Sequence, residues 1–330
     1  MAKRINPARS LLWRNSTDLQ LGLDQPVVLH GVTAEEERWL NLLQRGIADE
    51  AVTSQQLNLI QRIAPALVDF GSVRKPRLSH DYMQGAFAEL IRASFATNRD
   101  GVSVLESRAA VTVQLDSLGN GGLLVALGLC AAGIGRIITE DLALVSAQEV
   151  NPLGYRKSQV GARHIDAIRE ILKERNSPSV IEEVSRLTPA KRRSKLKVLV
   201  TGNALDPRRF RGLVDEHQPH LCVFFETSRV SVSPVVTDSP CLGCLDEAKR
   251  DADPAWPALA SQLIGRIEYL EDARSALFAS AMVVGEIVQR IDDPEAEREF
   301  VGHRLSIASG TVTEWRWAKH PNCYCSAEPA

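Results

Sequence analysis

Four cysteines near the end of the chain constrain its fold more than any other feature. Cys241 and Cys244 stand in P-C-L-G-C-L-D, and Cys323 and Cys325 stand in H-P-N-C-Y-C-S. The C-x-x-C and C-x-C spacings each place two sulfurs within reach of one ion, and four thiolates form the ligand set of a tetrahedral zinc site. Four sulfur ligands leave no position for water, so the pattern predicts a structural Zn²⁺ that ties the C-terminal tail to its domain. Disulfides, or four unrelated thiols, are the alternatives.

Composition narrows the class of protein. The 330 residues suffice for one large domain and a small one. The net charge of -2 gives no strong field for nucleic acid or a membrane surface. No apolar segment follows the basic start, so we expect no signal peptide, and the apolar run 121–134 is too short to span a bilayer. We therefore expect a cytoplasmic protein with neither nucleic acid nor membrane as a partner, and with Cys130 and Cys222 in its core.

The first part of the chain has the pattern of a small separate domain. The segments D-L-Q-L-G-L and V-V-L-H-G-V predict a hairpin that turns at 24–26. Two capping boxes, which begin at Thr33 and Thr53, each predict the start of a helix. Strand, strand, helix, helix is a winged-helix-like pattern, which we assign to residues 1–75. The polar, basic stretch 71–78 is the expected linker.

The rest of the chain, 76–330, alternates helices and strands after a first helix expected over 79–97. A-A-V-T-V-Q-L predicts a strand, S-L-G-N-G-G a glycine-rich turn, and an apolar helix leads to a second strand that ends in Asp141. Such a βαβ unit, with an acidic residue after the glycines, is typical of nucleotide-binding folds. We therefore predict a doubly wound, Rossmann-like α/β sheet with further helices at about 160–175, from 254 and from 270.

These motifs together resemble the ThiF/MoeB/HesA superfamily, the bacterial relatives of ubiquitin-activating enzymes. The resemblance rests on the strand and glycine turn, A-A-G-I-G-R, Asp141, the late C-x-x-C and the terminal cysteine pair, and it covers roughly residues 80–325. It implies a fold that binds ATP and adenylates the C-terminal carboxylate of a peptide or small protein. It also implies a zinc ion held by two cysteine pairs, and a homodimer.

The glycine turn departs from the family's G-x-G-G-x-G. Ser117 replaces the first glycine and Asn120 the third. Gly119 and Gly122 remain, and they either cradle a phosphate with backbone amides at a helix N-terminus or only permit the turn. Asp141 is either the ribose partner that the resemblance implies or a carboxylate at a strand end. ATP therefore stays a doubtful ligand.

The parts that perform adenylation in that family are also missing. Ala143 replaces the second carboxylate of its D-x-D, and 146–151 contain no counterpart of its phosphate-binding arginine. The magnesium-binding D-x-x-D-N is absent after V-L-V-T-G, where only Asn203 and Asp206 stand. Because magnesium and cations must neutralise the charge that develops on transferred phosphates, we predict a catalytically silent member.

A second resemblance agrees with this prediction. The cysteine segment P-C-L-G-C-L-D-E-A-K-R-D-A-D-P-A-W, ahead of the terminal H-P-N-C-Y-C, resembles the ThiF-like partner proteins of azole- and azoline-forming peptide biosynthesis. Those proteins carry an N-terminal winged-helix-like domain that binds the leader of a ribosomal peptide and presents it to a YcaO-type enzyme. Residues 1–75 fit such a domain by their pattern.

Three classes of function remain open from the sequence. The first is a catalytically degenerate scaffold that presents a ribosomal precursor peptide. The second is an active ATP-dependent adenylyltransferase that acts on the C-terminus of a peptide or small protein. The third is a dinucleotide-dependent oxidoreductase, against which the cysteine pattern argues.

Overall fold

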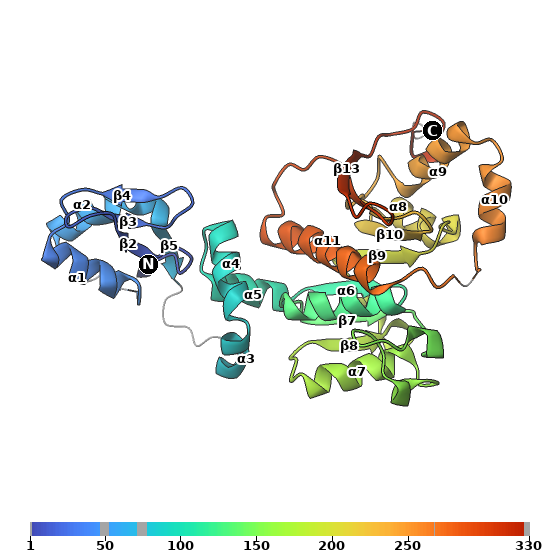
Figure 1. Ribbon diagram of the computed structural model, residues 1–330, viewed down its shortest axis with the longest axis horizontal. Coiled ribbons are helices and arrows are strands. Elements are labelled where there is room, and N and C mark those ends of the chain that lie inside the picture. The colour runs from blue at the N-terminus through green and yellow to red at the C-terminus, as the bar shows by residue number, and fades with distance from the viewer. Residues whose placement is uncertain (1, 47–52, 71–77, 267, 327–330) are drawn as a thin grey trace. The chain divides into compact units, whose positions relative to one another are not determined.

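The chain divides into two compact units, Met1–Arg108 and Ala109–Ala330. The structure, a computed structural model, describes residues 2–46, 53–70, 78–266 and 268–326 (Figure 1). The linker expected at 71–78 lies outside the described residues except for Leu78. The first unit reaches beyond the boundary expected after residue 75, because three further helices belong to it.

The N-terminal unit contains two small antiparallel sheets. A three-stranded sheet has the order β2-β3-β4, and a separate pair is formed by β1 and β5. The strands are β1 (Ala2–Ile5), β2 (Leu11–Trp13), β3 (Leu19–Leu21), β4 (Val27–Leu29) and β5 (Leu67–Phe70). The β3–β4 hairpin confirms the hairpin predicted around 24–26, and Gln25 adopts a left-handed conformation (φ 49°) in its turn.

Two helices cover this sheet, and both begin where the capping boxes predicted. In α1 (Ala34–Leu43) the Thr33 hydroxyl accepts from Glu36 N, and in α2 (Ser54–Arg62) Thr53 does the same for Gln56 N. Their apolar faces join the strands in one core, which includes the buried residues Ile5, Leu19, Leu21, Leu29, Trp39, Leu40, Leu43, Leu59 and Ile63. A winged-helix class for this unit stays a prediction.

Three more helices complete the unit: α3 (His80–Gly85), α4 (Phe87–Thr97) and α5 (Gly101–Ala109). The single helix predicted over 79–97 is thus interrupted at Ala86, and α5 was not predicted. Asn6 Nδ2 donates to the carbonyl oxygen of Ser94 (2.8 Å), and Arg4 forms an ion pair with Asp100. These contacts tie α4 and α5 to the segment of β1, which is why the unit does not end at residue 75.

The C-terminal unit is built on one eight-stranded sheet with the order β13-β12-β11-β10-β9-β6-β7-β8. Its strands are β6 (Thr112–Leu115), β7 (Arg136–Thr139), β8 (Val180–Glu183), β9 (Leu196–Thr201), β10 (His220–Glu226), β11 (Arg229–Val232), β12 (Val301–Ser306) and β13 (Val312–Arg316). The five neighbouring strands β8, β7, β6, β9 and β10 are parallel. Strands β11, β12 and β13 continue the sheet in antiparallel pairing. The predicted Rossmann-like α/β sheet is confirmed, with an antiparallel extension.

Six helices accompany the sheet: α6 (Asn120–Ala131), α7 (His164–Glu174), α8 (Arg211–Asp215), α9 (Leu242–Ala252), α10 (Trp256–Leu263) and α11 (Ala273–Asp292). Figure 1 shows α11 lying along α6. Helix α9 was not predicted. Short 3-10 turns lie at Ala64–Ala66, Ala147–Glu149, Lys157–Gln159, Val184–Arg186, Pro189–Arg192, Pro207–Arg209 and Tyr324–Ser326.

Successive side chains of the central strands point to opposite faces of the sheet. Val200 and Val223 pack in a core shared with α6, α7 and α11. Leu199 and Phe224 pack on the other face, in a core shared with α8 and α9. Because β6 pairs with both β7 and β9, the connections reverse direction at β6. In open α/β sheets, ligands bind at the carboxyl ends of strands at such a switch point.

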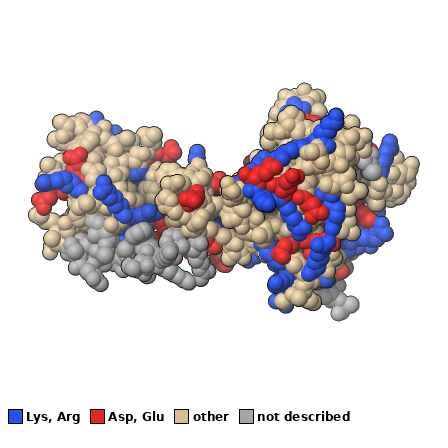
Figure 2. Space-filling view, turned by 90° about the horizontal axis from the view of Figure 1, so that it is seen from below, with Lys and Arg blue, Asp and Glu red and all other residues tan. Residues whose placement is uncertain are grey.

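Charge is mixed over the surface of the C-terminal unit. On the face in Figure 2, Lys and Arg side chains alternate with Asp and Glu side chains, in keeping with the small net charge. In the described part of the chain, every helix falls short of the length and apolarity needed to span a membrane.

Candidate functional site

The glycine turn joins the end of β6 to α6 at the switch point, as predicted. A Cβ at position 122 would lie 2.0 Å from the carbonyl oxygen of Ser117, so only glycine fits where the helix meets the strand. A Cβ at position 121 would lie 2.6 Å from the Phe225 ring. Gly119 is the N-cap residue of α6 and Asn120 its first residue. The glycines thus serve close packing in this structure, and they direct backbone amides toward the end of the sheet.

A carboxylate already lies at this helix N-terminus. Glu271 Oε2 accepts the Gly121 N–H at 2.5 Å, and a Cβ at Gly119 would lie 2.9 Å from the same oxygen. Burial raises the pKa of Glu271, and the Gly121 amide opposes that shift. Helix N-termini attract anions, and here the anion is the protein's own side chain. The sequence offered no signal for this contact, because Glu271 and Gly121 are 150 positions apart.

Asp141 follows β7 and points at the same turn. Its carboxylate accepts the N–H of Leu118 (2.6 Å) and the N–H of Ala143 (2.7 Å), and lies 3.2 Å from His164 Nδ1. Burial alone would raise the pKa of Asp141, but hydrogen bonds from His164 and from the two amides lower it. The predicted ribose partner is therefore engaged in holding the glycine turn to the start of α7.

His164 links two carboxylates beneath the turn. Its Nε2 lies 3.1 Å from Glu149 Oε1, and its ring stacks on Tyr155 with centroids 5.1 Å apart. The Tyr155 hydroxyl donates to the Leu118 carbonyl oxygen at 2.6 Å. Burial opposes protonation of His164, but the hydrogen bonds and charges of Asp141 and Glu149 raise its pKa to about 9. Sequence analysis missed His164, Glu149 and Tyr155, because they come from separate segments that only the fold brings together.

This network predicts a pH-dependent stability. His164 has a folded pKa of about 9 against an ordinary value of 6.5, so its contribution is fully present below about pH 6.5 and is lost as pH rises to 9. We expect the free energy of unfolding to fall by up to about 3 kcal/mol over that range. Urea unfolding at a series of pH values measures it. His164→Gln should flatten this alkaline limb, and equal slopes in both proteins would contradict the assignment.

On the other side of the switch point, the polar side chains are also bound to neighbouring protein groups. At the end of β6, Asp116 accepts the N–H of Val200 (3.0 Å) and pairs with Arg209 Nε (3.1 Å). Burial raises the pKa of the Asp116 carboxyl, and the charge of Arg209 opposes this. Asn203 donates to Glu268, and Asp206 pairs with Arg208 at 2.6 Å. Asn203 and Asp206, which stand where the resemblance would place magnesium ligands, are thus bound to neighbouring side chains.

A cavity of about 420 Å³ opens beside these residues. Its lining includes Thr201, Gly202, Arg208, Arg209, Arg266 and Glu271. Each of the three arginines has a carboxylate partner, namely Asp206, Asp116 and Glu268 in turn. The cavity therefore presents paired cations and a carboxylate, which is a poor environment for a triphosphate.

The four cysteines converge on the opposite face of the sheet. The Sγ atoms of Cys241 and Cys323 are 3.5 Å apart, those of Cys244 and Cys325 are 3.4 Å apart, and all four lie within 4.8 Å of one another. Tetrahedral Zn²⁺ with Zn–S bonds of about 2.3 Å holds its sulfurs about 3.8 Å apart. The cluster therefore has the dimensions of a metal site that could hold zinc.

Local structure explains why these sulfurs meet. Cys241 caps the N-terminus of α9, and a Cβ at Gly243 would lie 3.1 Å from Cys323 Sγ, so glycine leaves room for the tail. Trp317 Nε1 donates to the Cys241 carbonyl oxygen (3.2 Å), and His320 Nε2 lies 2.8 Å from Asp251. These contacts hold the tail against α9.

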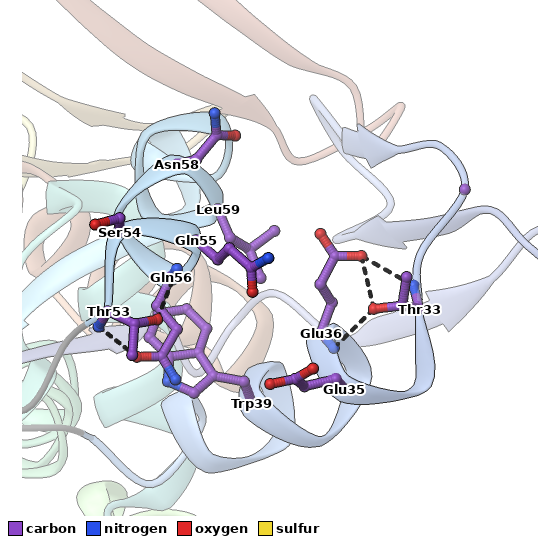
Figure 3. Close-up of a pocket in the computed structure, with 11 residues that line it drawn as sticks. Thr33, Glu35, Glu36, Trp39, Thr53, Ser54, Gln55, Gln56, Asn58 and Leu59 are labelled. Atoms are coloured by element: carbon purple, nitrogen blue, oxygen red, sulfur yellow. Dashed lines mark hydrogen bonds between the residues drawn. The ribbon is translucent and has the colours of Figure 1, made fainter.

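A second cavity, of about 670 Å³, lies in the N-terminal unit between the first turns of α1 and α2 (Figure 3). Trp39 and Leu59 form its apolar floor, and Glu35, Gln55 and Asn58 stand at its sides. Trp39 and Leu59 are buried, at 8% and 2% exposure. No motif in the sequence marked this cavity, because its walls are the polar sides of two ordinary helix starts.

The sheet, its switch point and the cysteine cluster define a Rossmann-like α/β protein with four cysteines that could hold a metal ion. No protein-family model matches the sequence, and no curated protein sequence matches it.

Solved structures do share the fold. The microcin C7 biosynthetic enzyme MccB in complex with N-formylated MccA has a TM-score of 0.65 and 12% identity, over 99% of this chain and 100% of that one. E. coli MccB with AMPCPP and MccA has a TM-score of 0.69 and 12% identity over the same shares. PaaA has a TM-score of 0.67 and 15% identity over 94% of this chain and 99% of its own. The chain therefore shares the fold of these structures, and at these identities the likeness concerns the fold alone.

Proposed function

We propose that this protein is a catalytically degenerate, ThiF-like scaffold that binds the leader of a ribosomal precursor peptide and presents it to a modifying enzyme. The observation that carries the loss of catalysis is the Glu271 carboxylate on the Gly121 amide. A phosphate at this helix N-terminus would have to displace the Glu271 carboxylate from the Gly121 amide.

The surrounding groups support the same proposal. Asp141 is committed to two amides and His164, and Arg209 is committed to Asp116. A transferred phosphoryl group needs unpaired cations or magnesium to stabilise its developing charge. In the described part of the chain, the residues that line the switch-point cavity supply neither an unpaired arginine nor a pair of free carboxylates for magnesium.

Peptide binding is assigned to the N-terminal unit. The order β2-β3-β4 makes β2 and β4 edge strands among the described residues. An edge strand offers unpaired backbone groups to which an extended peptide can add as a further strand, and neighbouring pockets then select side chains. Gly31, two residues after the end of β4, lines the cavity between α1 and α2, so that edge leads toward a pocket.

We also propose that Cys241, Cys244, Cys323 and Cys325 hold a structural Zn²⁺. The four free sulfurs lie within 4.8 Å of one another, which supports this proposal. Four sulfur ligands also fill every position of a tetrahedral site. The ion would close the tail onto α9 and would take no part in chemistry.

The C-terminal unit would then serve as the platform for assembly. The connection between β7 and α7 carries four exposed apolar side chains, namely Leu142, Leu144, Leu153 and Val160. Such surfaces mark protein interaction sites in soluble chains. We propose that this unit supports a homodimer and docks a YcaO-type enzyme in the cytoplasm.

Removal of the N-terminal unit tests the peptide assignment. We expect the full chain to bind a labelled synthetic leader, made from short reading frames beside the gene, in a fluorescence anisotropy titration. Residues 109–330 alone should bind at least about 100-fold more weakly, because the edge strand and its pocket are gone. Equal binding by the two proteins would refute the assignment.

An active adenylyltransferase is the second candidate, favoured by the amides that the Gly119–Gly122 turn still directs at the switch point. We expect no ATP–pyrophosphate exchange by the wild-type protein, because Glu271 holds the phosphate position. Glu271→Ala should gain weak stabilisation by Mg-ATP in a thermal shift assay, whereas Glu271→Gln, whose amide oxygen still accepts from Gly121, should not. Robust exchange by the wild type, abolished by Asp141→Ala, would establish the second candidate instead.

A further inference from the structure

We propose that the cavity of the N-terminal unit takes a cationic side chain, lysine or arginine, of the bound peptide. This inference rests on the proposed peptide-binding function and adds a specificity to it. It starts from the composition of the described part of the walls: two carboxylates, Glu35 and Glu36, one indole, Trp39, and no lysine or arginine among the described residues that line the cavity.

Some side chains of the cavity wall already form hydrogen bonds or ion pairs within the protein, so they are not available to a ligand. Glu36 accepts the Thr33 N–H (2.9 Å) and pairs with Arg62 (3.5 Å), so its charge is committed. Gln56 is likewise bound to the backbone of Thr53. These two side chains complete the capping boxes and face their own helices in Figure 3.

The groups that remain are one carboxylate and two amides, and all three have an oxygen that can accept from a cation. Within the described residues, no hydrogen bond or ion pair engages the side chains of Glu35, Gln55 or Asn58. Figure 3 shows Glu35 and Trp39 on α1, with the Trp39 ring directed toward Thr53 and Gln56, and it shows Gln55 and Asn58 on α2. A carboxylate and an indole that line one cavity can together bind an ammonium or guanidinium group, the carboxylate by its charge and the ring by its quadrupole.

An anion fits this cavity less well, although two helices begin there. The cap of each helix takes one first-turn amide, since Glu36 N donates to Thr33 Oγ1 (3.2 Å) and Gln56 N donates to Thr53 Oγ1 (3.4 Å). The first turn of α1 also carries Glu35, Glu36 and Glu37, which offset the positive end of its dipole. Charge complementarity therefore selects a cation.

Geometry also supplies a route for the peptide. Gly31 and Thr33, which line the cavity, directly follow β4, whose outer edge is unpaired among the described residues. A strand added to that edge would run past Gly31, and a long side chain could enter between α1 and α2. Lysine and arginine have the reach and the apolar stems to cover Trp39 and Leu59 while their charge meets Glu35.

Three blocked pentapeptides test the inference with the full-length protein. They are acetyl-Thr-Val-Lys-Val-Thr-amide and its analogues with norleucine or Glu at the centre, titrated while the indole N–H signal of Trp39 is followed by NMR. We expect the Lys peptide to bind several-fold more tightly than the norleucine peptide, and the Glu peptide most weakly. Glu35→Gln should weaken the Lys peptide about three- to fivefold, the range of an exposed ion pair.

Glu37→Gln is the matched control, because Glu37 lies in the same first turn of α1 but does not line the cavity. It should leave binding of the Lys peptide unchanged. Equal affinities for the three peptides, binding that is insensitive to Glu35→Gln, or no shift of the Trp39 signal would each overturn the inference. A leader that binds residues 109–330 as well as the full chain would refute the proposed function instead, and would leave these pentapeptide results as they are.

Discussion

Cys323→Ser is expected to abolish zinc binding and to lower the free energy of unfolding by at least about 4 kcal/mol, because the binding energy of a structural metal is folding energy. The sulfur of Cys323 lies 3.5 Å from that of Cys241, and its loss would leave three ligands and a free tail. Elemental analysis of protein purified without oxygen should give one zinc per chain for the wild type and none for the variant. Guanidinium unfolding measures the stability.

Cys130→Ala is the control for this experiment. Cys130 is buried in α6, on the other face of the sheet from the cluster, and its replacement should retain zinc at a cost of about 1 kcal/mol. Wild-type protein without zinc would end the metal assignment, as would a Cys323→Ser variant as stable as Cys130→Ala.

Asp141→Ala is expected to cost about 3–5 kcal/mol of stability, the range for breaking a buried ion pair. The change would strand a buried imidazolium, His164, and two amides, those of Leu118 and Ala143. A ribose-binding carboxylate would instead be nearly neutral for stability, so urea unfolding separates the two roles. Asp166→Ala on α7 removes only an exposed pair with Arg169 and should cost less than about 0.5 kcal/mol.

A second variant locates the cause of that cost. If the stranded imidazolium is responsible, His164→Gln combined with Asp141→Ala should recover part of the lost stability, in a double-mutant cycle. A cost below about 1 kcal/mol for Asp141→Ala alone would show that the carboxylate is not structural.

The sequence could predict those features that depend on residues close to one another along the chain. The capping boxes at Thr33 and Thr53 marked the starts of α1 and α2, and the glycine turn marked the start of α6. The cysteine pairs predicted a cluster because each pair can chelate an ion locally, and four thiolates can bind one ion together. Alternating apolar strands and helices predicted the parallel part of the sheet.

Contacts between distant segments could not be predicted in this way. Glu271 is one acidic residue among many, and only the packing of α11 against α6 brings it to the glycine turn. The extent of the N-terminal unit was missed for a related reason, since Asn6 reaches Ser94 across 88 positions. Helix α9 could not be predicted because its first turn carries the cysteine motif, and C-x-x-C spacing indicates a metal chelate rather than a helix start.

The cysteine cluster also bears on how firmly Glu271 is held. Glu271 belongs to the stretch between Cys244 and Cys323, which a metal would close into a ring. Closing a ring of this size removes chain entropy worth on the order of 4 kcal/mol. A side chain confined in this way acts at the Gly121 amide as a tethered ligand, with an effective concentration in the millimolar range or above. Free phosphate would have to compete with Glu271 at that effective concentration. Removal of the metal would open the ring and lower the effective concentration of Glu271, so phosphate would compete better.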